Sequence, residues 1–136
     1  MIAIHLAEGF EEIEALTVAD VLRRAGKDAQ LVSVSGNLMV TGAHGITVKA
    51  DCLFEDADYA ACEMLVLPGG MPGTKHLGEH QGLCRLLREF ATTENILPPS
   101  ARRRWYLAVW DCCAAGTRRS IRAWNLISRA RLAKSM

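Results

Sequence analysis

Residues 64–73 read Met64-Leu65-Val66-Leu67-Pro68-Gly69-Gly70-Met71-Pro72-Gly73, and this stretch decides the fold. Its apolar run ends at a proline and two glycines, which is typical of a strand buried on both faces. Because glycine has no Cβ, the backbone at Gly69 and Gly70 can turn sharply and approach a ligand closely. Ligands of open α/β sheets bind beyond the carboxyl ends of the strands. We therefore predict a substrate-facing loop at Gly69–Gly70, with a plain strand-to-helix turn as the alternative.

On both sides of this stretch, apolar runs alternate with helical patterns. Strands are expected at 2–7 and 29–34, a short hairpin at 38–48, and helices from Ile13 until Gly26 and over 82–91. The first helix has apolar residues at helical spacing, and Gly26 ends it. Strands separated by helices predict an α/β fold in which helices cover a mostly parallel sheet.

Length and composition restrict the class of protein. The 136 residues suit one domain, half of them are apolar, and no apolar run approaches a membrane span. The amino terminus lacks the features of a signal peptide. Five cysteines without a CxxC pair indicate a reducing, cytoplasmic setting, and the adjacent Cys112 and Cys113 are read as incidental rather than redox-active. No His/Cys set has zinc-site spacing, so no metal site is expected.

Charge divides the chain near residue 95. Residues 1–95 hold 7 Lys/Arg and 14 Asp/Glu, whereas residues 96–136 hold 9 Lys/Arg and one acid, Asp111. The second part also contains all three tryptophans, and the first part all four histidines. Such a split is typical of a domain boundary or of a nucleic-acid-binding tail.

Three carboxylates, Glu11, Glu12 and Glu14, follow the first predicted strand. If the strands are neighbours, an acid at this junction can face the same crevice as the Gly69–Gly70 loop. The structural alternative is that acids in a first helical turn simply favour the helix dipole. We prefer this alternative for Glu11 and Glu12 and leave Glu14 open. His5 is expected in the core, and the other histidines at the surface.

Three segments carry a family resemblance. They are Leu6-Ala7-Glu8-Gly9-Phe10-Glu11-Glu12-Ile13-Glu14-Ala15, Val40-Thr41-Gly42-Ala43-His44-Gly45-Ile46 and Leu65 to Gly73, and they resemble the ThiJ/PfpI superfamily, in its deglycase and glyoxalase-like branch. The resemblance covers residues 1–95 and implies a flavodoxin-like three-layer sandwich, commonly a homodimer, within the glutamine amidotransferase-like group. It implies that Glu14 hydrogen-bonds the catalytic thiol, that Gly69 and Gly70 form the oxyanion-side loop, and that no cofactor is used.

The nucleophilic cysteine that the family carries after its next strand is absent, and residues 96–136 resemble nothing in the family. With suitable codons, however, residues 97–108 read from the third base of the Leu97 codon give Ala-Ala-Ile-Cys-Ala-Ala-Pro-Met-Val-Leu-Gly. This is the family's nucleophile elbow, with its cysteine across the codons of Ser100 and Ala101. We therefore interpret the tail as the product of a frameshift, which leaves the sheet C-terminally incomplete.

Several functions remain open. The resemblance implies a cysteine-dependent glyoxalase or deglycase acting on methylglyoxal or its adducts, catalytically defective in this chain. Alternatives are a non-catalytic stress-response chaperone or binding protein, and a ThiJ-type protein of thiazole monophosphate or thiamine biosynthesis. A basic nucleic-acid-binding tail ranks third. We also expect residues 96–136 to complete the fold poorly, because Pro98-Pro99 cannot join a central strand and Arg102-Arg103-Arg104 cannot all be buried.

Overall fold

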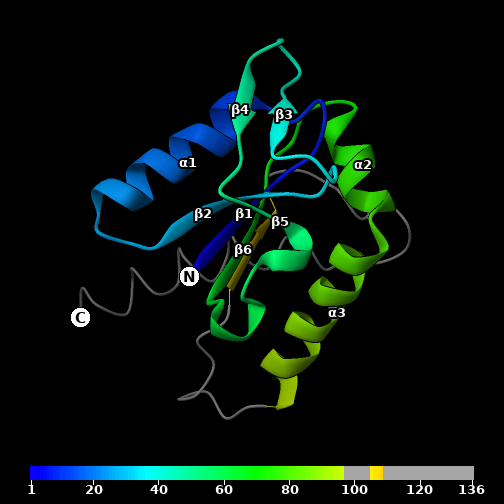
Figure 1. The fold of residues 1–136 in the computed structure, drawn as a ribbon. Coiled ribbons are helices and arrows are strands. Elements are labelled where there is room, and N and C mark those ends of the chain that lie inside the picture. Colours follow the sequence, from blue (N-terminus) through cyan, green and yellow to red (C-terminus); the bar gives the residue numbers. More distant parts are fainter. Residues whose placement is uncertain (97–104, 109–136) are drawn as a thin grey trace, which may run out of the picture.

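A five-stranded parallel sheet forms the centre of the chain, in the order β5-β2-β1-β6-β7 (Figure 1). The computed structural model describes residues 1–96 and 105–108. The strands are β1 (Ile2–Leu6), β2 (Ala29–Ser33), β5 (Cys52–Leu53), β6 (Met64–Leu67) and β7 (Trp105–Ala108). The predicted α/β class is confirmed, and all five carboxyl ends lie at one edge of the sheet.

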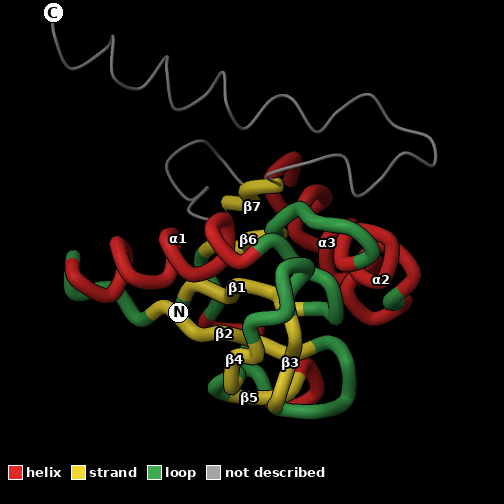
Figure 2. The backbone as a smooth tube through the Cα atoms, turned by 90° about the horizontal axis from the view of Figure 1, so that it is seen from above, coloured by secondary structure: helices red, strands yellow, loops and turns green. Residues whose placement is uncertain are grey.

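Helices cover both faces of the sheet, which makes three layers (Figure 2). Helix α1 (Glu12–Arg24) lies on one face, and α2 (Gly73–Glu79) and α3 (Gln81–Ile96) lie on the other. Side chains of β1 alternate between these faces, as the pleat of a strand requires. Ile4 packs in the same cluster as Ala15 of α1, and Ala3 in the same cluster as Phe90 of α3.

The strand that was predicted from the apolar run is confirmed at the centre of the fold. β6 pairs with β1 on one side and with β7 on the other, and the side chains of Leu65, Val66 and Leu67 are buried. A strand with neighbours at both edges and helices on both faces needs apolar residues throughout. The loop beyond Leu67 therefore leaves the sheet from a fixed position.

A separate antiparallel hairpin consists of β3 (Met39–Thr41) and β4 (Thr47–Lys49), joined through residues 42–46. Val40 is buried in the α1-side core and Val48 packs against it. Two 3₁₀ turns, Phe54–Asp56 and Tyr59–Ala61, then lead into β6.

The tail contributes more to the sheet than the sequence indicated. Within residues 96–136, which we expected to complete the fold poorly, residues 105–108 pair with β6 in parallel register, from Met64 opposite Trp105 to Leu67 opposite Ala108. Each residue of β7 has a backbone N–H, and two are aromatic, a residue class that favours strands. The predicted elbow at Ser100 and Ala101, together with residues 98–99, 102–104 and 109–136, lies outside the described residues, as do Cys112 and Cys113.

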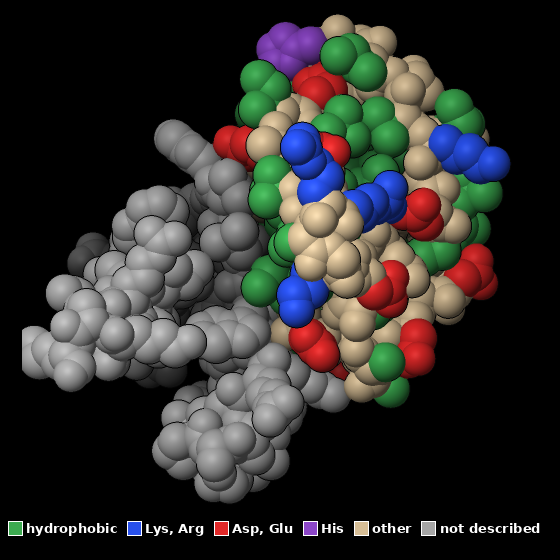
Figure 3. Space-filling model, turned by 90° about the vertical axis from the view of Figure 1, so that its left-hand side faces the viewer, with side chains coloured by type: hydrophobic (Ala, Val, Ile, Leu, Met, Phe, Trp, Pro, Cys, Tyr) green, Lys and Arg blue, Asp and Glu red, His purple; other side chains and the backbone are tan. Residues whose placement is uncertain are grey.

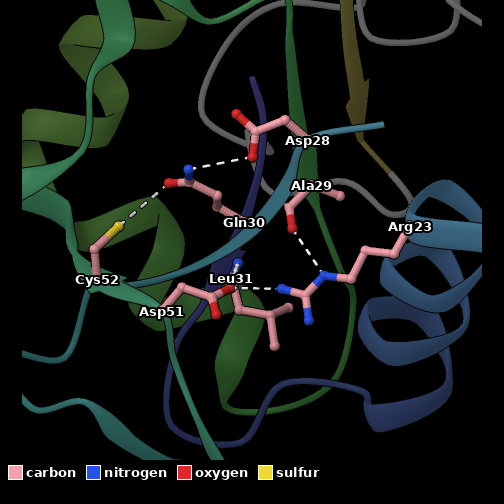
Figure 4. A network of polar contacts seen from close by, with 7 residues as sticks. All are labelled: Arg23, Asp28, Ala29, Gln30, Leu31, Asp51 and Cys52. Carbon is pink, nitrogen blue, oxygen red and sulfur yellow. Dashed lines mark hydrogen bonds and ion pairs between the residues drawn. The ribbon is translucent and has the colours of Figure 1, made fainter. Parts of the chain in front are cut away.

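Asp51 connects three elements on the α1 side (Figure 4). Its carboxylate accepts a hydrogen bond from the Leu31 N–H at 2.7 Å and pairs with Arg23 at 2.6 Å. Arg23 also donates to the Ala29 carbonyl oxygen. The end of α1, strand β2 and the start of β5 are thereby held together. None of the helices in the described part of the chain has the length and apolar content needed to cross a membrane.

Candidate functional site

The candidate site lies where the loops after β1 and β6 meet, at the carboxyl edge of the sheet. Glu14 stands in the first turn of α1 and is half-buried. Its Oε2 accepts a hydrogen bond from the Gly69 N–H at 2.5 Å. The Gly69 carbonyl oxygen accepts from the Glu11 N–H at 2.8 Å. Both polar groups of Gly69 are thus oriented by the amino-terminal end of α1, and Glu14 lies within hydrogen-bonding distance of the loop.

Gly70 is required by this arrangement. Its φ of +95° is in the region that favours glycine. A Cβ at this position would also lie 2.7 Å from the Gly9 carbonyl oxygen and would overlap the Glu11 backbone nitrogen. The two loops therefore pack backbone against backbone, which keeps Glu14 beside the Gly69 amide. A carboxyl group fixed beside a loop in this way can hydrogen-bond a nucleophile that approaches the loop.

Glu12 has a more specific role than the helix-dipole interpretation gave it. Its side chain is buried, Oε1 accepts from the His44 N–H at 2.7 Å, and Oε2 lies 2.9 Å from His44 Nδ1. Burial alone would raise the pKa of this carboxyl, but the hydrogen bonds from His44 and the local backbone outweigh it and lower the pKa to about 2. The same contact, with Glu11 nearby, raises the pKa of His44.

Gly42 makes room for the buried carboxylate, because a Cβ there would overlap the Glu12 carboxyl group. Within the described residues, Glu11, Glu12 and His44 form one cluster whose potential ligand atoms lie within 4.8 Å of one another. Both carboxylate oxygens of Glu12 already accept hydrogen bonds from His44. These hydrogen bonds make the cluster a clamp between the hairpin and α1.

His5 lies in the core, as the sequence predicted, on the face of β1 toward α3. Nδ1 is 3.3 Å from the Val66 carbonyl oxygen and Nε2 is 3.1 Å from the Tyr59 hydroxyl. A carbonyl oxygen only accepts, so Nδ1 carries the proton and Nε2 accepts from Tyr59. His80, expected at the surface, is half-buried, and its Nδ1 accepts from the Leu83 N–H at the start of α3.

A hollow of about 380 Å³ lies elsewhere, between the end of α2 and α3. Its lining residues are Gly78, Glu79, Gln81, Cys84, Arg85 and Arg88, which include none of the predicted site residues. The Cys84 thiol donates to the Gly78 carbonyl oxygen at 3.2 Å. This thiol belongs to helix packing and not to the arrangement around Glu14.

Comparison with known proteins identifies relatives in sequence. The pattern of the DJ-1/PfpI family matches residues 1–100. Protein DJ-1 homolog B of Arabidopsis thaliana is 35% identical over 88 residues, which are 65% of this chain and 20% of that protein. The Parkinson disease protein 7 homolog of Danio rerio is 31% identical over 87 residues, 63% of this chain and 46% of that protein.

Solved structures resemble the chain over a larger share of its length. Toxoplasma gondii DJ-1 in its oxidized form superposes with a TM-score of 0.72 at 27% identity, covering 83% of this chain and 56% of that one. Drosophila melanogaster DJ-1beta superposes with a TM-score of 0.69 at 27% identity, covering 79% of this chain and 53% of that one. The chain thus spans about half the length of these structures.

Proposed function

This chain belongs to the DJ-1/PfpI family, and from that premise we propose that it carries one half of a cofactor-free, cysteine-dependent glyoxalase or deglycase site. The substrate class is methylglyoxal or its adducts. In this proposal Glu14 holds the thiol, and Gly69 and Gly70 line the oxyanion side. The chain as written lacks turnover because the nucleophile is missing.

The observation that supports the proposal is the hydrogen bond between Glu14 and the Gly69 N–H, at the carboxyl edge of β6. When a thiolate adds to an aldehyde carbon, negative charge moves to the aldehyde oxygen, and oriented donors stabilise it. A glutamate beside such a loop can hydrogen-bond the incoming sulfur. Helix α1 and the backbone packing at Gly70 fix both groups before substrate arrives.

The other half of the site would come from the tail in its alternative reading frame. There the cysteine falls across the codons of Ser100 and Ala101, whereas Cys112 and Cys113 do not match the elbow. We also propose that the chain works in a reducing cytoplasm, which suits the free thiols of Cys52, Cys62 and Cys84.

The test restores the reading frame from Leu97 onward and measures methylglyoxal consumption. We expect turnover in the restored chain and none in the chain as written. In the restored chain, Glu14→Gln should lower kcat/KM by about 10²–10⁴-fold, the usual contribution of a positioned acid or base. Glu11→Gln is the matched control, because Glu11 contacts the loop through its backbone N–H. Turnover by the chain as written that disappears on replacing Cys112 or Cys113 would contradict the proposal.

We further propose that two copies pair, as members of this family commonly do. Large apolar side chains remain exposed at Ile13 and Val21 of α1, at Ile46 of the hairpin and at Met71 of the site loop. Figure 3, which views the molecule from the left-hand side of Figure 1, shows hydrophobic side chains between the charged ones on that face. Exposed apolar side chains of this kind also favour a second function, non-catalytic binding of unfolded chains. Sedimentation of Ile13→Glu against wild type tests pairing: a concentration-dependent dimer should become a monomer.

A further inference from the structure

The tip of the hairpin is fastened to the segment that leads into α1. The Ala43 N–H donates to the Phe10 carbonyl oxygen, and the Gly9 N–H donates to the Thr41 carbonyl oxygen, both at 2.8 Å. These two bonds join segments about 30 residues apart and belong to neither sheet. Docking of the hairpin tip therefore depends on a few contacts, and a change in any one of them can shift the balance between docked and open tip.

One docking contact involves a histidine, whose charge depends on pH. His44 Nδ1 lies 2.9 Å from Glu12 Oε2 and 3.6 Å from Glu11 Oε1. Glu8 also faces the hairpin and accepts from the Thr41 N–H at 3.2 Å. Within the described residues, none of these three acids pairs with a lysine or arginine. The positive charge that faces these acids is therefore that of protonated His44.

We propose that His44 is a pH-sensitive latch. Its charged ring strengthens the docking of the hairpin tip against the amino-terminal end of α1, and loss of its proton raises the fraction of molecules with an open tip. The neutral ring retains at most a hydrogen bond to Glu12, without the attraction between opposite charges. The steric fit of Gly42 over the Glu12 carboxyl group keeps that carboxylate in place to receive the ring.

The direction of the pH effect follows from the two pKa changes. The pKa of His44 is raised above 6.5 in the docked state. Its contribution is complete below pH 6.5 and is lost as pH rises through the docked pKa. The pKa of Glu12 is lowered from 4.5 to about 2, so its contribution is lost as pH falls below 4.5. Docking should be strongest between these limits.

Release of the latch reaches the candidate site through the backbone. The segment that receives the hairpin also contacts the β6 loop, where the Glu11 N–H donates to the Gly69 carbonyl oxygen and the Gly73 N–H donates to the Gly9 carbonyl oxygen. An open tip removes the support behind one of the two loops that meet at Gly69. The latch is defined by hairpin contacts alone and does not depend on turnover.

The experiment is amide hydrogen exchange on the full chain between about pH 6 and pH 9, together with NMR titration of the His44 ring. Protection factors of the Ala43 and His44 amides report the docked tip, and the Val34 amide, which donates to the Leu6 carbonyl oxygen, reports the sheet. The opening constant of the tip should rise with pH while that of Val34 stays level. Proton linkage fixes the size of this effect. The total rise in the opening constant, expressed in powers of ten, should equal the difference between the measured His44 pKa and 6.5.

Variants of the full chain distinguish the effect of His44 protonation from the titration of other groups. His44→Gln should open the tip equally at every pH, and His44→Arg should keep it docked at high pH. Glu12→Gln should return the His44 pKa toward 6.5. His76→Gln is the control, because His76 contacts the Glu8 carbonyl oxygen in the same segment. Opening that is independent of pH in the wild type, or a pH dependence that persists in His44→Gln, would overturn the inference.

Discussion

The wild-type chain should lose stability in mild acid, and replacing His5 with glutamine should remove this loss. His5 is fully buried on β1, where its Nδ1–H donates to the Val66 carbonyl oxygen and its Nε2 accepts from the Tyr59 hydroxyl. Burial lowers the pKa of His5 from 6.5 to about 4, against the raising effect of the Val66 contact. A protonated ring could no longer accept from Tyr59 and would bury a charge.

The size of this stability loss follows from the two pKa values of His5, 6.5 in the unfolded chain and about 4 in the folded chain. Below pH 6.5 the unfolded chain binds a proton that the folded chain refuses, so stability falls as pH falls. The loss should be about 2 kcal/mol at about pH 5 and should level off near about 3 kcal/mol below the folded pKa. Losses of this size are a large part of the stability of an ordinary domain.

The assay is urea unfolding of the full chain from about pH 7.5 down to about pH 5. His5→Gln cannot titrate, so its unfolding free energy should fall by about 2 kcal/mol less than that of the wild type over this range. His76→Gln, at an exposed position on α2, should keep the wild-type pH dependence. The comparison uses slopes, because glutamine also loses the ring contact with Tyr59. Equal slopes in wild type and His5→Gln would refute the reasoning, as would an NMR pKa of His5 near 6.5.

Two further predictions concern the supports of the fold. Asp51→Ala leaves the buried Leu31 N–H without its acceptor and should cost about 1–3 kcal/mol in urea unfolding. Arg23→Ala removes a half-exposed ion-pair partner and a donor to the Ala29 carbonyl oxygen, but it leaves the Leu31 N–H bonded to Asp51, so it should cost about 1 kcal/mol. A cost equal to or above that of Asp51→Ala would contradict this account. Gly42→Ala should cost about 1–3 kcal/mol, since its Cβ overlaps the Glu12 carboxyl group. Crystals of that variant with an unmoved Glu12 would argue against the clamp.

Hydrophobic pattern was sufficient to predict the main elements but not all of them. Long periodic segments such as α1 and the apolar run of β6 were found because each buries several residues in a regular order. Helix α2 was missed, because its seven residues include two glycines and its pattern is too short to show a period. β5 has only two residues and is defined by its pairing with β2. Such short elements form because of contacts with residues distant in the sequence, and a local sequence pattern does not reveal these contacts.

The site was partly predictable for the same reason. Glu14 and Gly69 each follow a predicted parallel strand, so their meeting at one edge could be expected. The pair formed by Glu12 and His44 could not, since 32 residues separate them and the sequence shows only an acid in a helix and a histidine in a turn. The nearby Gly42 carried the signal that the sequence does contain, because a glycine in a strand pattern often marks close packing; in the structure its φ is outside the region that favours glycine.

The coding DNA across codons 94–108 tests most directly the claim that this chain is a DJ-1/PfpI scaffold without its nucleophile. The account predicts that the frame beginning at the third base of the Leu97 codon encodes Ala-Ala-Ile-Cys-Ala-Ala-Pro and continues open beyond it. Codons for Ser100 and Ala101 that do not yield cysteine in that frame, or an early stop in it, would contradict the account and leave residues 96–136 as a tail of independent origin.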